Sequence, residues 1–304
     1  MGNRRLEVGG GKAEVAIDIG VRIRALDAML ARDQKGGPRV LPVLRYPGGK
    51  QRMLTFLSRF LPKGDEIRGR YVEPFVGGGA VFLYVQPRRA VISDLNSELI
   101  DLYRGIRIDP LGVWKRYVLW GSTKEEYNRV RTLDPSQLGV TERAARLLYL
   151  NRTCFKGNWR HNANGEFNIG YGGQSRRWVV TKDYLVGVSG ALACAEIRCG
   201  DFEPVIDGCG QGDYLFVDPP YRPGQRELVN AHYLWKRFTF ADDERLAAAL
   251  RRCLKRGVTW CLTTSAHADI LRLFQGFRVL EVPPRREGLS SSGEVLILGD
   301  GGGE

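Results

Sequence analysis

The chain has 304 residues, 43% hydrophobic and 26% charged, enough to form the core of one elaborated α/β domain or of two smaller units. Its net charge of +12 favours an anionic partner, with nucleic acid ahead of an acidic membrane surface. Six cysteines without a Cys-x-x-Cys pair, and three histidines without metal-ligand spacing, argue against a zinc site or a redox pair. No secretory signal or long apolar span is recognised, so a cytoplasmic protein without a metal is expected.

The first 40 residues are rich in Gly and Arg. They contain one helical pattern, over Val21 to Arg32, and close with Lys35-Gly36-Gly37-Pro38. We predict a loosely attached extension over residues 1–40, and a flexible tail over residues 299–304.

A strand, a glycine turn and a helix are predicted from Arg70 to Leu83. The turn, Glu73 to Gly79, contains three consecutive glycines, which allow a backbone to approach a nucleotide closely. A second strand, Ala90 to Ser93, ends at Asp94, where a carboxylate can accept from ribose hydroxyls. The turn lacks the dinucleotide fingerprint and a following Gly-Lys-Ser/Thr, so a nucleoside without a pyrophosphate fits better than a nicotinamide cofactor or a phosphate loop.

The sheet pattern stops near Leu102 and resumes near Glu196, which predicts an inserted unit over residues 102–195. Helical patterns cover Leu111 to Trp120 and Thr141 to Leu150, with Thr141 as the expected N-cap. The insertion is therefore predicted to be mainly helical.

A basic stretch follows these helices, from Arg152 to Lys182. It carries six basic residues and one acidic residue, interleaved with Asn and aromatic side chains. Basic groups suit phosphates, amides suit base edges and rings suit stacked bases, so the stretch predicts a nucleic-acid-binding hairpin. A solvated hairpin over buried aromatic rings is the alternative. The candidate contact residues are Arg152, Lys156, Asn158, Trp159, Arg160, Asn162, Arg176, Arg177 and Lys182.

The segment from Asp213 to Tyr221 is a short apolar strand that ends in Asp218-Pro219-Pro220-Tyr221. The prolines cannot continue a ladder, so the following carbonyls point outward unpaired. These oxygens and the carboxylate suit an exocyclic amine, and the ring of Tyr221 offers a face to a base extracted from its helix. Because ligands of open α/β sheets bind at the carboxyl ends of strands, the segment predicts methyl transfer to an amino nitrogen. An ordinary strand end with a Pro-Pro turn is the alternative.

After a loop expected to be flexible through Asn230, the chain predicts a helix from Asp242 to Arg256 and a strand from Val258 to Thr264. A hairpin of residues 277–282 with residues 293–298 closes the sheet. The predicted fold class is α/β, a Rossmann-like sheet with helices on both faces, over residues 41–101 and 196–298.

Four motifs occur in the order found in the Dam or D12 class of DNA adenine-N6 methyltransferases, the α-group amino-methyltransferases, and the chain resembles that family over residues 41 to 300. The motifs are Leu44 to Lys50, Glu73 to Gly79, Ser93 to Asn96 and Asp218 to Tyr221. Two further stretches, Asn151 to Arg160 and Gly165 to Gly172, are similar to the family's DNA-contacting hairpin region.

The resemblance implies a class I methyltransferase fold that uses S-adenosylmethionine, and residues 102–195 as the target-recognition unit. Lys50 would pair with the methionine carboxylate, Asp94 would accept from the ribose, and Asp201 with Phe202 would hold the cofactor adenine. The implied cofactor-binding residues are Tyr46, Gly48, Gly49, Lys50, Glu73, Pro74, Phe75, Gly77, Gly79, Asp94, Asn96, Asp201, Phe202 and Asp218. The implied catalytic residues are Asp218, Pro219, Pro220 and Tyr221.

The implied reaction is site-specific methylation of N6 of a flipped-out adenine in double-stranded DNA. The enzyme is expected to act as a monomer, with a cognate restriction endonuclease as an associated partner. Three alternatives stay open: methylation of an RNA base, methylation of cytosine N4, and a catalytically silent DNA-binding relative. Asp rather than Ser before Pro-Pro-Tyr, together with the motif order, favours adenine, and the intact Lys50 and Asp218 argue against a silent relative.

Overall fold

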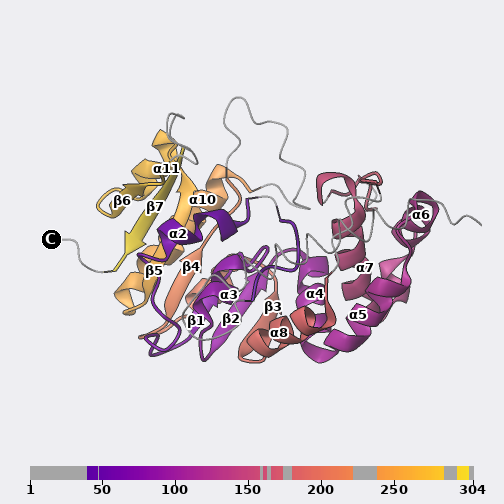
Figure 1. The fold of residues 1–304 in the computed structure, drawn as a ribbon. Helices are drawn as coiled ribbons and strands as arrows, with labels where there is room; N and C mark the ends of the chain where they lie inside the picture. Colours follow the sequence, from indigo (N-terminus) through magenta and orange to yellow (C-terminus); the bar gives the residue numbers. More distant parts are fainter. Residues whose placement is uncertain are drawn as a thin grey trace, which may run out of the picture.

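A seven-stranded sheet forms the centre of the computed structural model, which describes residues 40–46, 48–157, 160–162, 166–173, 180–221, 238–283 and 293–300. The strands are β1 (Tyr71–Glu73), β2 (Ala90–Asp94), β3 (Ala195–Cys199), β4 (Tyr214–Val217), β5 (Thr259–Ser265), β6 (Arg278–Glu281) and β7 (Glu294–Gly299). Their order is β3-β2-β1-β4-β5-β7-β6 (Figure 1). Strands β1 to β5 run parallel, while β7 is antiparallel to β5 and β6.

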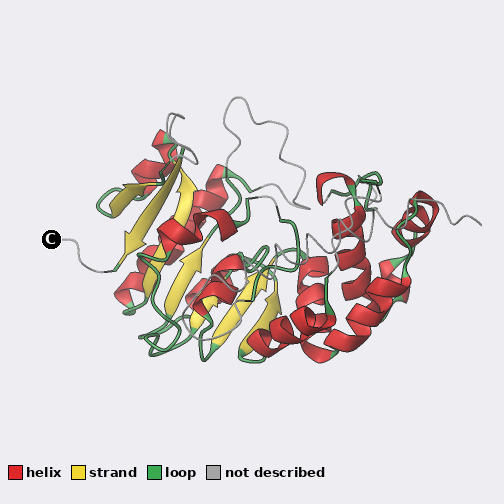
Figure 2. Cartoon of the chain, viewed as in Figure 1, coloured by secondary structure: helices red, strands yellow, loops and turns green. Residues whose placement is uncertain are grey.

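Each face of the sheet buries its own hydrophobic cluster, because successive side chains of a strand point to opposite faces. Tyr71 and Phe216 belong to one cluster, and their neighbours Val72 and Leu215 belong to the other. The first is covered in part by η1 (Lys50–Met53), α2 (Leu54–Leu57) and α3 (Ala80–Val85). The second is covered by α9 (Phe202–Asp207), α10 (Phe240–Lys255) and α11 (Ala268–Leu273). The predicted sheet with helices on both faces is confirmed (Figure 2).

Helices occupy most of the connection between β2 and β3. They are α4 (Ser97–Ile108), α5 (Pro110–Leu119), α6 (Lys124–Arg131), η2 (Pro135–Gln137), α7 (Val140–Thr153), η3 (Phe155–Gly157) and α8 (Lys182–Leu192). Figure 1 shows them gathered beside the β3 end of the sheet. The boundary expected at residue 102 falls inside α4, and residues of α4, α7 and α8 share a hydrophobic cluster with the sheet. The helical region therefore begins at Ser97 and packs directly on the sheet.

Three local expectations need correction. Helix α7 starts at Val140 rather than at a Thr141 cap, because the Glu142 carboxylate accepts from the Gly139 N–H at 2.9 Å. Helix α10 starts at Phe240, with Asp242 accepting from the Thr239 N–H at 2.9 Å. Gly299 is not part of a tail: it pairs with Trp260 in the sheet, where a Cβ would lie 2.0 Å from the indole.

Several expectations lie outside the described residues. They are the extension over residues 1–39, the loop through Asn230, the end of the tail, and the contact residues Asn158, Trp159, Arg176 and Arg177. In the part of the chain that the structure describes, no helix is long and apolar enough to cross a membrane, and no cluster of His, Cys, Asp or Glu could hold a metal ion.

Candidate active site

The predicted motifs meet along one edge of the sheet, where β3, β2, β1 and β4 end side by side. Backbone hydrogen bonds join the loops that follow these strands. Val76 N–H donates to the Ser93 carbonyl at 2.8 Å, and Gly200 N–H donates to the Asp94 carbonyl at 3.1 Å. The carboxyl edge of a parallel sheet is where open α/β folds bind ligands, so these loops form the candidate site.

The glycine turn is held in place by the neighbouring strand and by two tyrosines. The Asp94 carboxylate accepts from Gly77 N–H at 3.0 Å and from Asn96 N–H at 2.9 Å, and the Tyr103 hydroxyl donates to the Gly77 carbonyl at 2.6 Å. Gly77 has a φ of +46°, and a Cβ there would lie 3.1 Å from the Tyr46 ring. Glycine is therefore required by both the backbone conformation and the close approach of Tyr46.

Asn96 acts in this structure as the N-cap of α4. Its side-chain oxygen accepts from the N–H groups of Glu98 and Leu99. Asn96 therefore caps α4, while the neighbouring Asp94 braces the glycine turn.

The Asp218 carboxylate is the focus of a second cluster, at the end of β4. Its Oδ1 atom receives three donors: Lys50 Nζ at 2.7 Å, Thr263 Oγ1 at 2.7 Å and the Tyr221 hydroxyl at 3.2 Å. Among the residues that the structure describes, none donates to the other carboxylate oxygen of Asp218, Oδ2. One oxygen of the carboxylate is therefore anchored, and the other is available to a substrate.

Lys50, expected to meet the methionine carboxylate, contacts the last motif in this structure. Its side chain is only 4% exposed, its ammonium pairs with Asp218, and it lies 4.8 Å from the centroid of the Tyr221 ring. It also donates to the Gly48 carbonyl at 3.1 Å. These contacts join the first motif to the last one, across 168 positions of the sequence.

Thr263 is a site residue that sequence reasoning missed. It follows Leu262, which pairs with Val217 in the parallel register of β4 and β5, so Thr263 stands beside Asp218 at the same sheet edge. Polar residues near the end of the apolar strand β5, in Thr263-Thr264, were the signal. Strand order was needed to read it, because only adjacent strands bring their ends together.

Glu73 is buried at the end of β1, where the Tyr71 hydroxyl donates to its Oε2 at 2.7 Å. Burial raises the pKa of Glu73 from 4.5 to about 8; repulsion by Asp218 and Asp94 adds to the rise, and the Tyr71 hydrogen bond opposes it. The carboxyl is therefore largely neutral at pH 7, which removes one negative charge from the surroundings of Asp94 and Asp218.

Stability should consequently fall as the pH rises from 4.5 to 8, since the folded state holds a proton on Glu73 that the unfolded chain releases at the ordinary pKa. This stabilisation is complete below the unfolded pKa and is lost as the pH rises through the folded one. Glu73→Gln, which stays neutral, should flatten the dependence in urea unfolding measured across this window. Glu66→Gln, at an exposed carboxylate, is the control, and an unchanged slope in Glu73→Gln would contradict the assignment.

Phe202 and Phe75, both expected near the cofactor, are in contact, with ring centroids 5.2 Å apart. Phe238 packs on both rings, at 5.9 Å from Phe75 and 6.0 Å from Phe202. Asp201 caps α9 by accepting from Glu203 N–H, and it pairs with Arg245 at 2.8 Å. The expected cofactor-adenine residues therefore form an aromatic cluster beside a charged pair.

The hairpin region is anchored at its base and carries polar groups further out. The backbones of Cys154 and Tyr171 form one isolated antiparallel β-bridge, and those of His161 and Phe167 form another. Arg160 Nε donates to Asn168 Oδ1 at 2.9 Å, while Lys156, Asn162 and Lys182 are exposed.

Arg152 is the exception among the expected DNA contacts. It is 7% exposed on α7, and its guanidinium donates to the Val43 carbonyl. A buried guanidinium bound to backbone does not suit a phosphate contact, so we leave Arg152 out of the proposed DNA surface.

The sheet order β3-β2-β1-β4-β5-β7-β6, with helices on both faces, is that of the class I methyltransferase fold. Residues 46–287 match the family model of the D12 class N6 adenine-specific DNA methyltransferases, and the chain belongs to this family. The residue-based resemblance is thereby confirmed.

Relatives agree with this membership. The DNA N-6-adenine-methyltransferase of Escherichia phage P1 is 34% identical over 250 residues, covering 80% of this chain but only 32% of the phage protein. The type II methyltransferase M1.LlaDCHI of Lactococcus lactis subsp. cremoris is 30% identical, covering 87% of this chain and 95% of its own length. The type II methyltransferase M.MjaIII of Methanocaldococcus jannaschii is 30% identical, with coverages of 81% and 92%.

Proposed function

We propose that this protein transfers a methyl group from S-adenosylmethionine to N6 of a flipped-out adenine in double-stranded DNA. The proposal rests on the different surroundings of the two Asp218 carboxylate oxygens. Lys50, Thr263 and Tyr221 donate to Oδ1, whereas none of the described residues donates to Oδ2. An exocyclic amine supplies the N–H donor that this oxygen does not receive from the described residues.

The residues around the glycine turn fit the cofactor chemically. Asp94 offers a carboxylate for ribose hydroxyls, glycines 77 to 79 permit close approach, and the half-buried Phe75 ring, packed on the buried Phe202, offers apolar surface for a purine. S-adenosylmethionine would supply an electrophilic methyl group on a positively charged sulfur. Tyr46, packed on the turn, would border the same pocket.

The proposed mechanism depends on placement more than on acid–base strength. The N6 lone pair of adenine is delocalised into the ring, so Asp218 Oδ2 and the carbonyl that follows accept the two amine hydrogens and orient the lone pair toward the methyl group. Tyr221 would stack on the base, and the buried Pro219 stiffens the loop between them. Bound S-adenosylmethionine would supply the methyl group to the oriented nitrogen, and the methylated amine would then release one proton. Proximity and preorganised acceptors supply the acceleration.

The proposed DNA surface comprises the exposed residues Lys156, Asn162 and Lys182, together with Arg160. Asn158, Trp159, Arg176 and Arg177 extend the same proposal. The proposal also includes action as a monomer, a location in the cytoplasm and an association with a cognate restriction endonuclease. The type II names of two relatives bear on the last of these.

Incubation with labelled S-adenosylmethionine and either duplex DNA or RNA, followed by digestion and identification of the labelled base, tests the proposal directly. N6-methyladenine from DNA is the expected product. Label in N4-methylcytosine or in RNA would support an alternative, and no label in any nucleic acid would reject the activity.

Thr263→Val should slow methylation by about 10-fold or more, because a hydrogen bond to a charged group is lost while side-chain shape is kept. Thr263→Ser, which restores the hydroxyl, should recover most of the rate. Thr264→Val makes the same chemical change one position along β5, at a residue without a contact to Asp218, and should behave like the wild type. Equal rates in the two valine variants would refute the positioning role of Thr263.

A further inference from the structure

Asn151, at the start of the hairpin motif, points into the protein. It is 2% exposed, and its side-chain amide pairs with the backbone of Arg45 in both directions: Oδ1 accepts from Arg45 N–H at 2.9 Å, and Nδ2 donates to the Arg45 carbonyl at 2.9 Å. Nδ2 also donates to the Gly157 carbonyl at 3.2 Å. One amide therefore binds two segments that are far apart in the sequence.

The first of these segments leads to the reacting groups. Arg45 is followed by Tyr46, whose ring packs on Gly77 and Gly78, and then by Lys50, whose ammonium holds Asp218. We call the described residues 41–46 and 48–50 the Lys50 segment. A displacement of the Arg45 backbone would be passed to the glycine turn by the Tyr46 ring, and toward Lys50 and Asp218 by the Tyr46 carbonyl, which accepts from Gly49 N–H at 3.0 Å.

The second segment leads to DNA. Gly157 ends η3 at the base of the hairpin, which we define by its described residues 154–157, 160–162 and 166–171. Its φ is +70°, and a Cβ at this position would lie 2.8 Å from the side chain of Arg45. The hairpin base and the Lys50 segment are thus in direct contact, and Asn151 fastens them together.

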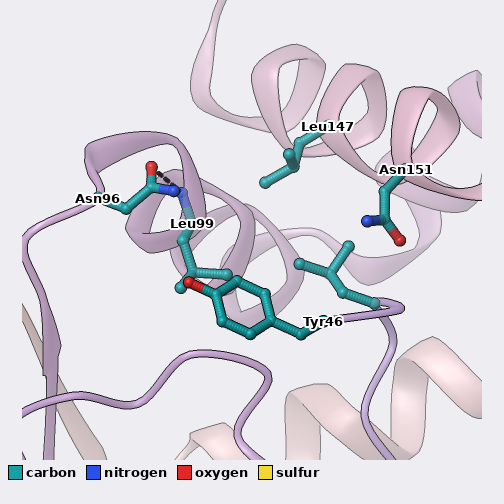
Figure 3. A pocket seen from close by; sticks show the side chains of 6 residues that line it. Tyr46, Asn96, Leu99, Leu147 and Asn151 are labelled. Carbon is teal, nitrogen blue, oxygen red and sulfur yellow. Dashed lines mark hydrogen bonds between the residues drawn. The ribbon is translucent and has the colours of Figure 1, made fainter. Parts of the chain in front are cut away.

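Two further observations indicate that α7 and α8 hold the Lys50 segment firmly in place. Arg152 donates to the Val43 carbonyl and Tyr184 donates to the Leu41 carbonyl, so α7 and α8 hold the Lys50 segment at three points. The space between Asn151, Leu147 and Tyr46 is a cavity of only 10 Å³, too small for a ligand (Figure 3). In Figure 3 Asn151 and Leu147 project from the same helix toward this segment.

We propose that Asn151 is a positioning residue that couples the seating of the hairpin on DNA to the placement of Lys50 and Asp218. The inference rests on the proposed function. A hairpin seated on its correct site would hold Gly157, Asn151 and Arg45 in the arrangement seen here, and a poorly seated hairpin would shift Arg45. Recognition would then act on the chemical step as well as on binding.

The test compares single-turnover methylation of a cognate duplex, mapped with the wild type, with that of a duplex carrying one changed base pair. Asn151→Asp keeps the oxygen that accepts from Arg45 N–H but turns the donor into an oxygen facing two carbonyls. Asn151→Ser shortens the side chain and is run in parallel. Tyr149→Phe is the matched control, because it removes a hydrogen bond from the same helix to Gly121, away from the Lys50 segment.

Both Asn151 variants should lose discrimination between the duplexes in the methylation rate by at least about 10-fold, while the binding constant for the cognate duplex stays close to that of the wild type. Tyr149→Phe should keep the full rate discrimination. Intact discrimination in both variants, or losses that parallel weaker duplex binding, would overturn the coupling. A wild-type protein that methylates no duplex would instead overturn the proposed function.

Discussion

Asp218→Asn should lower the methylation rate by on the order of 10³-fold, the usual cost of removing a group aimed at the reacting centre. The amide has the size of the carboxylate but offers only one acceptor oxygen. Because Lys50 and Thr263 both donate to Oδ1, that oxygen should stay with them, and the NH₂ group should face the adenine amine. Two donors would then oppose each other where an acceptor is needed.

Duplex binding separates this effect from general damage. The variant should bind DNA as tightly as the wild type in titrations, since the proposed partner of Asp218 is the adenine amine and not a phosphate. Asp207→Asn, at a partly exposed carboxylate paired with Arg252, is the control and should retain full activity. Wild-type turnover by Asp218→Asn would remove Asp218 from the catalytic role.

Lys50→Met should both abolish rapid methylation and destabilise the protein by about 2–3 kcal/mol, because it leaves the Asp218 carboxylate without its buried cationic partner. The cost is below that of a fully buried pair, since 19% of the Asp218 side chain is exposed. Methionine keeps the length and apolar volume of the lysine stem, so loss of the charge is the main change.

A double-mutant cycle isolates this interaction. Lys50→Met combined with Asp218→Asn removes both charges, so urea unfolding should show the double variant to be more stable than Lys50→Met alone. Lys63→Met, at an exposed lysine near Glu66, is the control and should change stability little. Additive losses in the cycle would mean that the two side chains do not interact in solution.

Lys50 has two candidate partners, the cofactor carboxylate and the Asp218 carboxylate. The sequence interpretation assigns its ammonium to the cofactor carboxylate, and the structure assigns it to Asp218. Calorimetry of S-adenosylmethionine binding to Lys50→Met distinguishes the two partners. An unchanged affinity would rule out the cofactor carboxylate as a partner of Lys50.

The sequence by itself determined the elements that depend on neighbouring residues. Apolar runs that end at Glu73, Asp94 and Asp218 became parallel strands whose ends share one edge, and the predicted C-terminal hairpin formed β6 and β7. Such features are readable because strand periodicity, turn glycines and proline restrictions act over a few residues. The predicted starts of the helices that begin at Val140 and Phe240 were wrong by one or two positions. The reason is that a carboxylate in the first turn can accept from the N-cap N–H, so the cap need not be the polar residue nearest the apolar pattern.

Only the tertiary structure decided which distant side chains meet. Thr263 reaches Asp218 across 45 positions because β4 and β5 are adjacent in register, and Asn151 reaches Arg45 across 106 positions because α7 packs on the Lys50 segment. The same packing turned Arg152 inward, although its sequence neighbourhood is typical of a DNA-binding surface. Charge and composition report the chemical character of a segment, but burial and hydrogen-bond partners are set by the elements packed against it, which the local sequence does not contain.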